Sequence, residues 1–354
     1  MEFLPISRFR KISNTKFLTL SELKKIKPIT VTMDLQVLEA PENVENLNSL
    51  AAQGLVLFPV KRISLQDAYQ DRKDFPRRVL FEMTSICNIR CKMCPQMNLK
   101  RKPMYMDKEK YKSIVEELDR FGLDGLWLFH FGESLTHPNF KELVEYINTK
   151  KKLGYIWLST NGSLLNKELI DFLLSSSLGY LNFSLQSISV EKYKEISPNA
   201  PAERILSNLH SLIEKKQKLI GSKPYFRLQM IEQQSTLSEL DTFLRTYYDK
   251  CDLISVNMLE HTDLEFNKES KSLRQRNDRI TCKRLGRYDC FINSDGSVAI
   301  CDNMYNNELD IGNIWEKSVY DIWNGAERKR IMKMNEEGGI WDIPFCSECS
   351  DYDL

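Results

Sequence analysis

Three cysteines that lie within eight residues, Cys87, Cys91 and Cys94, are the side chains of this sequence best suited to chemistry. They directly follow an apolar run at residues 79–84. Thiolates at this spacing on one tight loop can bind three irons of an iron-sulfur cube and leave the fourth iron open. No fourth cysteine or histidine lies nearby to complete a tetrahedral zinc site. The spacing therefore favours a 4Fe-4S cluster with one open iron, and zinc with a ligand from elsewhere is the alternative.

Short apolar strands alternate with helical patterns downstream of this loop. Such alternation is typical of repeated β-α units that build a parallel sheet. Because parallel crossovers are right-handed, six units predict an α/β fold whose sheet curves into a partial (β/α)6 TIM-like barrel. We expect strands at residues 79–85, 125–131, 154–160, 180–186, 225–231 and 252–259, and helices at residues 107–120, 139–152, 166–176, 202–218 and 236–249.

One face of the predicted strands is repeatedly polar. Successive strand residues point to opposite faces of a sheet, and the alternate positions, such as Leu181, Phe183 and Leu228, are apolar. A closed barrel is usually filled by branched aliphatic side chains. A polar interior therefore predicts a cavity for a polar ligand, whereas an antiparallel sheet with one solvated face is disfavoured by the intervening helices. The polar positions are Glu82, Thr84, His130, Ser159, Asn161, Asn182, Ser184, Gln186, Arg227, Gln229, Ser255 and Asn257.

Three segments at the predicted strand ends complete a recognisable series. Phe131-Gly132-Glu133-Ser134 follows the second strand, Ser159-Thr160-Asn161-Gly162 closes the third, and Ser184 lies on the fourth. Together with the cysteine loop and in this order, they resemble the radical S-adenosylmethionine (radical SAM) superfamily. Two positions, Phe131 and Ser134, differ from the Gly-Gly-Glu-Pro motif of that family.

The resemblance implies cofactors and a reaction. The open iron would hold the amino and carboxylate groups of SAM, and Gly132 and Glu133 would lie in the motif whose backbone binds the methionine ammonium group. Ser159, Asn161 and Ser184 would face the ribose and other polar groups of SAM. Electron transfer into SAM, from a reducing partner such as flavodoxin or ferredoxin, would yield a 5′-deoxyadenosyl radical that abstracts hydrogen from a substrate.

Four further thiols predict a second metal site in the C-terminal part. A β-hairpin is expected around Asp295-Gly296, and a helix at residues 318–333 is followed by Gly338-Gly339. This arrangement resembles the twitch domain, a shortened SPASM domain of radical SAM dehydrogenases, and implies an auxiliary 4Fe-4S cluster without an open iron. Zinc is the alternative, because four thiols with one CxxC pair would suit it equally. The four ligands would be Cys282, Cys301, Cys346 and Cys349.

Two residues are candidates for a direct part in catalysis. Cys290 is open to three interpretations: a further cluster ligand, a core thiol, or a hydrogen donor of the kind that radical SAM epimerases use. Arg227 is the one permanent cation among the polar strand positions, and it should bind an anionic or polyhydroxy group. The remaining Cys251 is expected to be a buried apolar thiol.

Composition excludes several classes of partner. The 50 basic residues nearly cancel the 49 acidic ones, so the chain lacks the positive field on which nucleic-acid binding depends. No apolar stretch approaches the ~20 residues of a membrane span, and the start shows no signal-peptide pattern. We therefore expect a cytoplasmic protein whose nine cysteines stay reduced and bind metals.

Three parts are predicted: an N-terminal extension at residues 1–78, which is a recognition or cap domain, a barrel at 79–270, and an auxiliary-cluster domain at 271–354. In the extension we expect strands at 29–35 and 55–60 and a helix at 41–53. The whole pattern favours a radical SAM oxidoreductase that dehydrogenates or epimerises a small polar substrate, a sugar or cyclitol. The second hypothesis is a maturase of a ribosomal peptide, and the third is a non-catalytic metal-binding scaffold.

Overall fold

The computed structural model describes most of the predicted barrel and C-terminal region, and two short strands before them. β1 (Glu2–Phe3) pairs antiparallel with β2 (Pro59–Val60). The strand expected at 29–35 and the helix expected at 41–53 lie outside the described residues and stay predictions. The described residues are 2–3, 59–60, 74–219, 222–247, 250–258, 281–282, 284–347 and 349.

The centre of the molecule is a curved parallel sheet, which confirms the predicted fold class. Its strands follow one another in sequence order, each paired in parallel with the next. The first two end earlier than predicted, at Phe81 and Trp127. The strands are β3 (Arg78–Phe81), β4 (Gly125–Trp127), β5 (Tyr155–Thr160), β6 (Tyr180–Leu185), β7 (Tyr225–Glu232) and β8 (Leu253–Met258).

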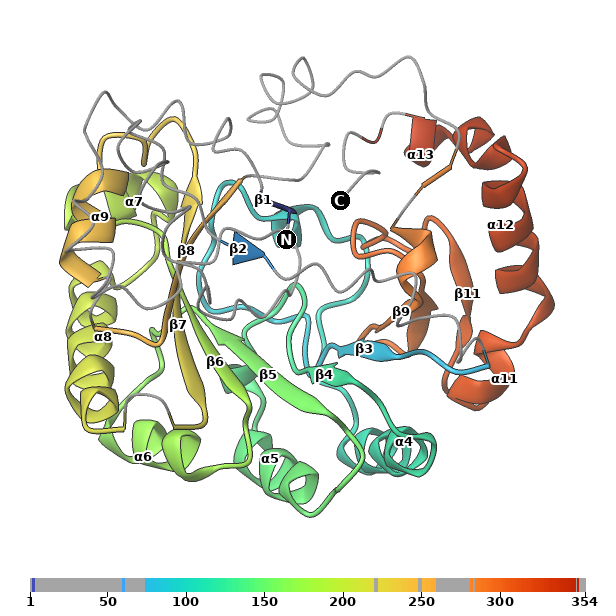
Figure 1. The fold of residues 1–354 in the computed structure, drawn as a ribbon, viewed down its shortest axis with the longest axis horizontal. Coiled ribbons are helices and arrows are strands. Elements are labelled where there is room, and N and C mark those ends of the chain that lie inside the picture. The colour runs from blue at the N-terminus through green and yellow to red at the C-terminus, as the bar shows by residue number, and fades with distance from the viewer. Residues whose placement is uncertain are drawn as a thin grey trace.

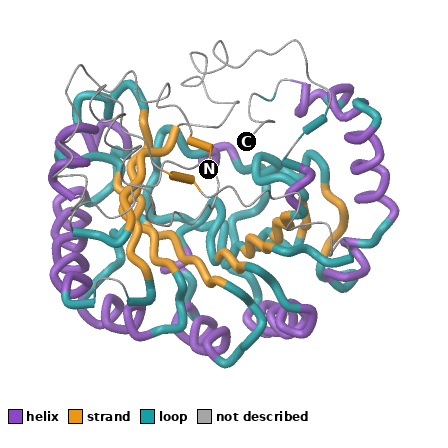
Figure 2. The backbone as a smooth tube through the Cα atoms, viewed as in Figure 1, coloured by secondary structure: helices purple, strands orange, loops and turns teal. Residues whose placement is uncertain are grey.

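Helices cover the outer, convex side of this sheet, so the strands form the inner layer of the barrel (Figures 1 and 2). Five of them correspond to the predicted helices, and the short α7 was not predicted. None of the helices in the described ranges has the length and apolar composition of a membrane span. The helices are α4 (Lys108–Phe121), α5 (Phe140–Asn148), α6 (Lys167–Ser175), α7 (Val190–Ile196), α8 (Ala202–Gln217) and α9 (Leu240–Tyr247).

α4 illustrates why these segments are helical. The Asp107 side chain accepts a hydrogen bond from the backbone N–H of Lys110 and caps the first turn. Apolar residues at helical spacing, Tyr111, Ile114 and Leu118, are buried against the sheet. The ring of Tyr111 stacks on that of Phe81 in β3 with centroids 4.3 Å apart. The helix is therefore fixed against the strand that leads into the cysteine loop.

The C-terminal strands extend the barrel sheet and do not form a sheet of their own. β9 (Asp289–Ile292) runs parallel to β3, and β10 (Ser297–Ala299) pairs antiparallel with β9. The predicted hairpin is thus confirmed, with Gly296 at a φ of 89° in its turn. β11 (Asp310–Asn313) forms the far edge, so the described residues contain one sheet of nine strands, from β11 to β8. This continuity places the auxiliary region directly against the barrel interior.

The helix predicted at 318–333 is two helices, α11 (Val319–Trp323) and α12 (Ala326–Glu336). The break falls at Asn324 and Gly325, because Gly325 adopts an extended conformation with a ψ of 164° and glycine is a poor helix former. Short helices complete the structure: η2 (Pro95–Asn98), η3 (Ser134–Thr136), η5 (Leu285–Arg287), η6 (Gly339–Asp342) and α13 (Pro344–Ser347).

Candidate active site

A cavity of about 460 Å³ lies inside the curved sheet, and strands β3 to β7 and β9 contribute to its walls. The alternation of polar and apolar strand positions is confirmed, since Leu181, Phe183 and Leu228 on the opposite face are completely buried. Eight of the predicted polar positions line the cavity: His130, Ser159, Asn161, Asn182, Ser184, Gln186, Arg227 and Gln229.

Glu82, Thr84 and Ser255 are not among the residues that line the cavity. β3 ends at Phe81, and the alternation of strand side chains no longer applies to Glu82 and Thr84. Ser255 is the register partner of Gln229 and so lies on the predicted inner face, where it accepts a hydrogen bond of 2.9 Å from Nε of Arg227. The side chain of Asn257 lies outside the described part of the chain.

Cys87, Cys91 and Cys94 all line this cavity. The pKa of the thiols of Cys87 and Cys91 is raised to about 12, and that of Cys94 to about 11, mainly because the three thiols are buried. Two polar groups offset this by donating to sulfur: the Ser197 hydroxyl lies 2.9 Å from Sγ of Cys91, and Nδ2 of Asn161 lies 3.9 Å from Sγ of Cys87. Such donors are typical of thiolates that bind a metal cluster.

The segment that follows α7 holds the cysteine loop in place. The backbone N–H of Lys92 donates to the carbonyl of Ile196 at 2.9 Å, and that of Arg90 donates to Oδ1 of Asn199 at 2.7 Å. The sequence analysis missed both α7 and this role. Ser189, whose side chain accepts from the N–H of Lys192, was the available signal for the start of the helix.

Gly132 brings the loop after β4 into contact with the cysteine loop. A Cβ atom at this position would lie 2.0 Å from the carbonyl oxygen of Thr84, so only glycine permits this approach. The neighbouring N–H of Glu133 donates to the carbonyl of Ile86, directly before Cys87, at 2.9 Å. Gly132 and Glu133 both line the cavity.

The Glu133 carboxylate connects this loop to the end of β5. It accepts hydrogen bonds from the hydroxyl of Thr160 at 2.9 Å and from the backbone N–H of Asn161 at 2.7 Å. Burial raises the pKa of Glu133 to about 7, although these hydrogen bonds oppose the shift. The turn ends at Gly162, which has a φ of 74° and packs so closely on the Phe183 ring that a Cβ atom would lie 2.1 Å from it.

Asn161, Ser159 and Ser184 complete the wall next to the cysteine loop. Asn161 donates to Oδ1 of Asn88 at 3.1 Å and so orients the loop between Cys87 and Cys91. Ser159 accepts from Nδ2 of Asn182 at 2.9 Å, and Ser184 accepts from Nε2 of Gln186 at 3.0 Å. The structure thus brings all five residues proposed for SAM binding to one cavity.

The C-terminal cysteines lie near enough to one another for their charges to interact. Burial is the largest cause of the raised pKa of Cys346, to about 12, and the neighbouring thiolates of Cys282 and Cys349 raise it further. Burial, the charge of Asp302 and, less strongly, the charge of Cys282 hold the pKa of Cys301 well above its usual range. Among the described residues, no three His, Cys, Asp or Glu side chains are close enough to hold a single metal ion.

Cys290 faces away from the cavity. It pairs with Val79 of β3, and both side chains are buried on the same side of the sheet. Its neighbours Asp289 and Phe291 line the cavity instead. This placement fits the core thiol among the three interpretations and gives the hydrogen-donor role no support. Cys251 is completely buried, as predicted.

Arg227 lines the cavity and is almost completely buried. Its guanidinium group lies 5.6 Å from the ring centroid of Trp157, and burial lowers its pKa to about 10. Two other arginines that the sequence analysis did not identify, Arg78 and Arg287, also line the cavity. Arg78 forms a bidentate pair with Asp289 at 2.6 and 2.8 Å.

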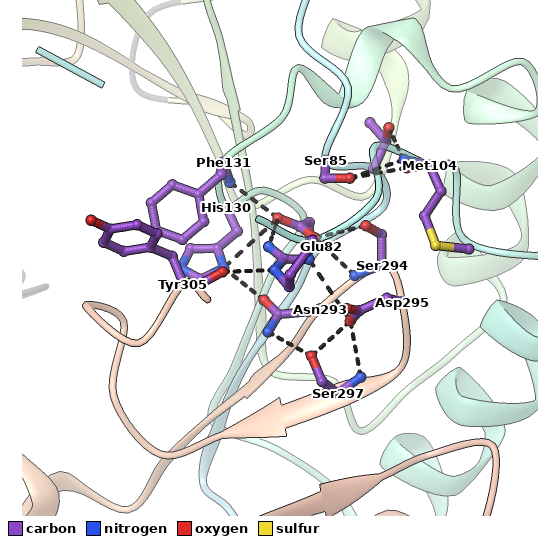
Figure 3. Close-up of polar contacts among 12 residues, drawn as sticks. Glu82, Ser85, Met104, His130, Phe131, Asn293, Ser294, Asp295, Ser297 and Tyr305 are labelled. Carbon is purple, nitrogen blue, oxygen red and sulfur yellow. Dashed lines mark hydrogen bonds and ion pairs between the residues drawn. The ribbon is translucent and has the colours of Figure 1, made fainter. Parts of the chain in front are cut away.

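A buried ion pair joins the barrel to the C-terminal hairpin (Figure 3). Glu82 accepts from Nη1 and Nη2 of Arg101 at 3.0 and 3.1 Å and from the N–H and hydroxyl of Ser294, both at 2.8 Å. Arg101 also donates to the carbonyl of Tyr305 at 2.7 Å. Although burial pushes the pKa of Glu82 up, Arg101 and the other donors hold it below its usual range.

His130 makes a second connection beside this pair (Figure 3). Its ring nitrogens lie 3.2 Å from Oδ1 of Asn293 and 3.3 Å from the carbonyl oxygen of Asp302. Burial is the main cause that lowers the pKa of His130. Asp302 follows Cys301 directly and also lines the cavity that Cys87, Cys91 and Cys94 line. The cavity therefore extends from the first cysteine group to the residue next to Cys301.

Comparison with known proteins identifies the class to which this geometry belongs. Residues 81–222 match the radical SAM superfamily, and residues 282–350 match an iron-sulfur cluster-binding domain of the SPASM type. The chain is a radical SAM enzyme with a C-terminal SPASM-type domain. Its cofactors are SAM, a SAM-binding 4Fe-4S cluster and an auxiliary iron-sulfur cluster.

Two curated relatives cover most of this chain. The tungsten-containing aldehyde ferredoxin oxidoreductase cofactor-modifying protein of Pyrococcus furiosus is 23% identical over 316 residues, which are 76% of this chain and 86% of the relative. The S-adenosyl-L-methionine-dependent 2-deoxy-scyllo-inosamine dehydrogenase of Niallia circulans is 24% identical over 286 residues, which are 76% of this chain and 91% of the relative.

Solved structures share the fold. BtrN in complex with AdoMet and 2-DOIA is 19% identical, with a TM-score of 0.51 and coverage of 78% of this chain and 93% of that chain. Native anSMEcpe with bound AdoMet is 16% identical, with a TM-score of 0.56 and coverage of 78% of this chain and 91% of that chain.

The residues of the cavity fit these cofactors. Cys87, Cys91 and Cys94 would hold the SAM-binding cluster, and Gly132 and Glu133, which line the same cavity, would lie beside SAM. The carboxamide oxygen of Gln186 is buried without a hydrogen-bond partner and would accept from SAM or substrate. When bound, these cofactors supply the 5′-deoxyadenosyl radical that takes a hydrogen atom from the substrate.

Proposed function

We propose that this enzyme dehydrogenates a hydroxyl-bearing carbon of a small polar molecule, a sugar or cyclitol. In this reaction the carbon gives one hydrogen atom to the deoxyadenosyl radical, and the hydroxyl group gives one proton to a base. The substrate radical then gives one electron to the auxiliary cluster and becomes a ketone. The cluster ligands would be Cys87, Cys91 and Cys94 at one site and Cys282, Cys301, Cys346 and Cys349 at the other.

The shared cavity is the observation that supports this reaction. Asp302, the residue directly after Cys301, lines the same cavity as the first three cysteines. A substrate in this cavity would therefore lie between the SAM-binding cluster and an electron acceptor. Electron transfer to a second cluster is needed for dehydrogenation but not for a reaction that returns the hydrogen atom.

Dehydrogenation is favoured over epimerisation by the position of the thiols. An epimerase needs a hydrogen donor that faces the substrate, and Cys290 faces the opposite side of the sheet. Of the described residues that line the cavity, the cysteines are Cys87, Cys91 and Cys94. Similarity to the 2-deoxy-scyllo-inosamine dehydrogenase gives additional support for a cyclitol substrate.

Deuterium transfer tests the proposal. The anaerobically reconstituted enzyme is incubated with SAM, reductant and a set of C-deuterated cyclitols and sugars, and with a deuterated peptide as the comparison. We expect deuterium in 5′-deoxyadenosine from a cyclitol or sugar, with one ketone formed per deoxyadenosine. Deuterium from the peptide, or an inverted alcohol that carries solvent hydrogen, would contradict the assignment.

A further inference from the structure

One polar layer crosses three neighbouring strands in the cavity wall. Ser159 of β5 pairs with Asn182 of β6, and Asn182 pairs with Arg227 of β7. Because register partners in a parallel sheet point to the same face, their side chains lie side by side. All three line the cavity. On β6 this layer lies two residues before Ser184, on the side of the N-terminal ends of the strands.

The amide of Asn182 is hydrogen-bonded to the neighbouring strand. Its Nδ2 atom donates to Oγ of Ser159 at 2.9 Å. Oδ1 is then the atom that faces the remaining space, and it is buried without a hydrogen-bond partner. The residue as a whole is 3% exposed.

An unpaired carboxamide oxygen is costly in a buried place, because it has given up its hydrogen bonds to water. Nearly all buried polar groups in folded proteins have a partner. A donor on a ligand would satisfy Oδ1 of Asn182, and the guanidinium group of Arg227 on the next strand can donate to an oxygen of the same ligand. A hydroxyl group beside a second oxygen atom meets both requirements.

We propose that Asn182, with Ser159 and Arg227, forms the subsite that binds adjacent hydroxyl groups of a polyhydroxylated ring. Asn182 accepts from one hydroxyl group, and Arg227 donates to the oxygen of its neighbour. This inference rests on the proposed function, in that it assigns the position of the substrate in that reaction. It also distinguishes a polyol, which has hydroxyl donors on adjacent carbons, from a peptide side chain without them.

Substitution of Asn182 by leucine separates a ligand-binding role from a structural one. Asn182→Leu removes an unpaired acceptor together with one hydrogen bond to Ser159, and because these effects oppose each other the melting temperature should change little. Binding of labelled myo-inositol and D-glucose to the SAM-loaded holoenzyme, measured by equilibrium dialysis, should weaken about 10- to 100-fold for whichever polyol the wild type binds. Asn182→Asp keeps an acceptor oxygen and should retain more binding than Asn182→Leu.

Asn166→Leu is the matched control. The Asn166 side chain caps α6 by accepting from the N–H of Leu169, so its oxygen is already paired and lies in a helix cap. This variant should lower the melting temperature and leave polyol binding unchanged. The opposite results in the two variants would show that the Asn182 oxygen serves a ligand.

Several outcomes would overturn the subsite. These are normal polyol binding by Asn182→Leu, a loss of SAM affinity as large as the loss of polyol affinity, a large drop in its melting temperature, or no binding of either polyol to the wild type. The proposed function fails separately, if a polyol binds through Asn182 but its deuterium does not reach deoxyadenosine.

Discussion

Loss of the Glu82 carboxylate should destabilise the junction between the barrel and the hairpin. Glu82→Gln removes the charge that pairs with Arg101, and its new NH2 group would face the donors of Arg101 and Ser294. Both partners of the ion pair are at most 3% exposed. Removal of one partner of a buried pair costs about 3–5 kcal/mol, which is a change of at least roughly 100-fold in the folding equilibrium.

Urea unfolding of the reconstituted protein measures this cost. The matched control is Glu327→Gln, which breaks an exposed pair with Arg330 whose side chains are 44% and 50% exposed, and it should cost less than about 1 kcal/mol. Equal unfolding midpoints for wild type and Glu82→Gln would refute the reasoning. Such a result would mean that water or a rearranged Arg101 replaces the carboxylate.

The same pair predicts a pH dependence. The folded-state pKa of Glu82 lies below its ordinary value of 4.5, so the ionised carboxylate contributes stability that is present above that value. This contribution is lost as the pH falls from 4.5 through the folded-state pKa. The difference in unfolding free energy between wild type and Glu82→Gln should therefore shrink in this range and stay constant from pH 6 to 8 at about its maximum. A difference that grows on acidification would contradict the assignment.

Three further outcomes are expected. Replacement of Cys87, Cys91 and Cys94 together by alanine should leave one cluster of two by iron and sulfide analysis, because the C-terminal thiols form an independent site; loss of all iron would disprove that independence. Glu133→Ala should weaken SAM binding in equilibrium dialysis while the iron content stays normal, because the carboxylate orients the turn at residues 160–161; unchanged affinity would argue against the motif. Arg227→Ala should reduce deoxyadenosine formation far more than the melting temperature, and unfolding without selective loss of ligand binding would remove Arg227 from the site.

The cysteine loop and the polar wall were predictable because both depend on local rules. Strand side chains alternate with a period of two, so the assignment of Asn182 and Ser184 to one face and of Leu181 and Phe183 to the other needed only the strand itself. The same rule did not reveal that Glu82 pairs with Arg101 and is not among the residues that line the cavity. β3 ends one residue earlier, and propensity does not locate strand ends to a single residue.

Contacts between distant segments were decided by the tertiary structure alone. Glu82 lies 212 residues from Ser294, and Arg90 lies 109 residues from Asn199, whose side chain holds the cysteine loop. The sequence also left three interpretations of Cys290 open. Because β9 pairs with β3, the Cys290 thiol points into the core, and the side chains of Asp289 and Phe291 point toward the cavity.

The sequence by itself determined the chemistry that this protein can perform, since ligand type, spacing and strand period are local properties of the chain. Only the tertiary structure decided that Asp302, the residue directly after Cys301, borders the same cavity as Cys87, Cys91 and Cys94, because this depends on β9 joining the sheet beside β3. That pairing forms between segments about two hundred residues apart, where the free energy of burial and hydrogen bonding outweighs any local preference.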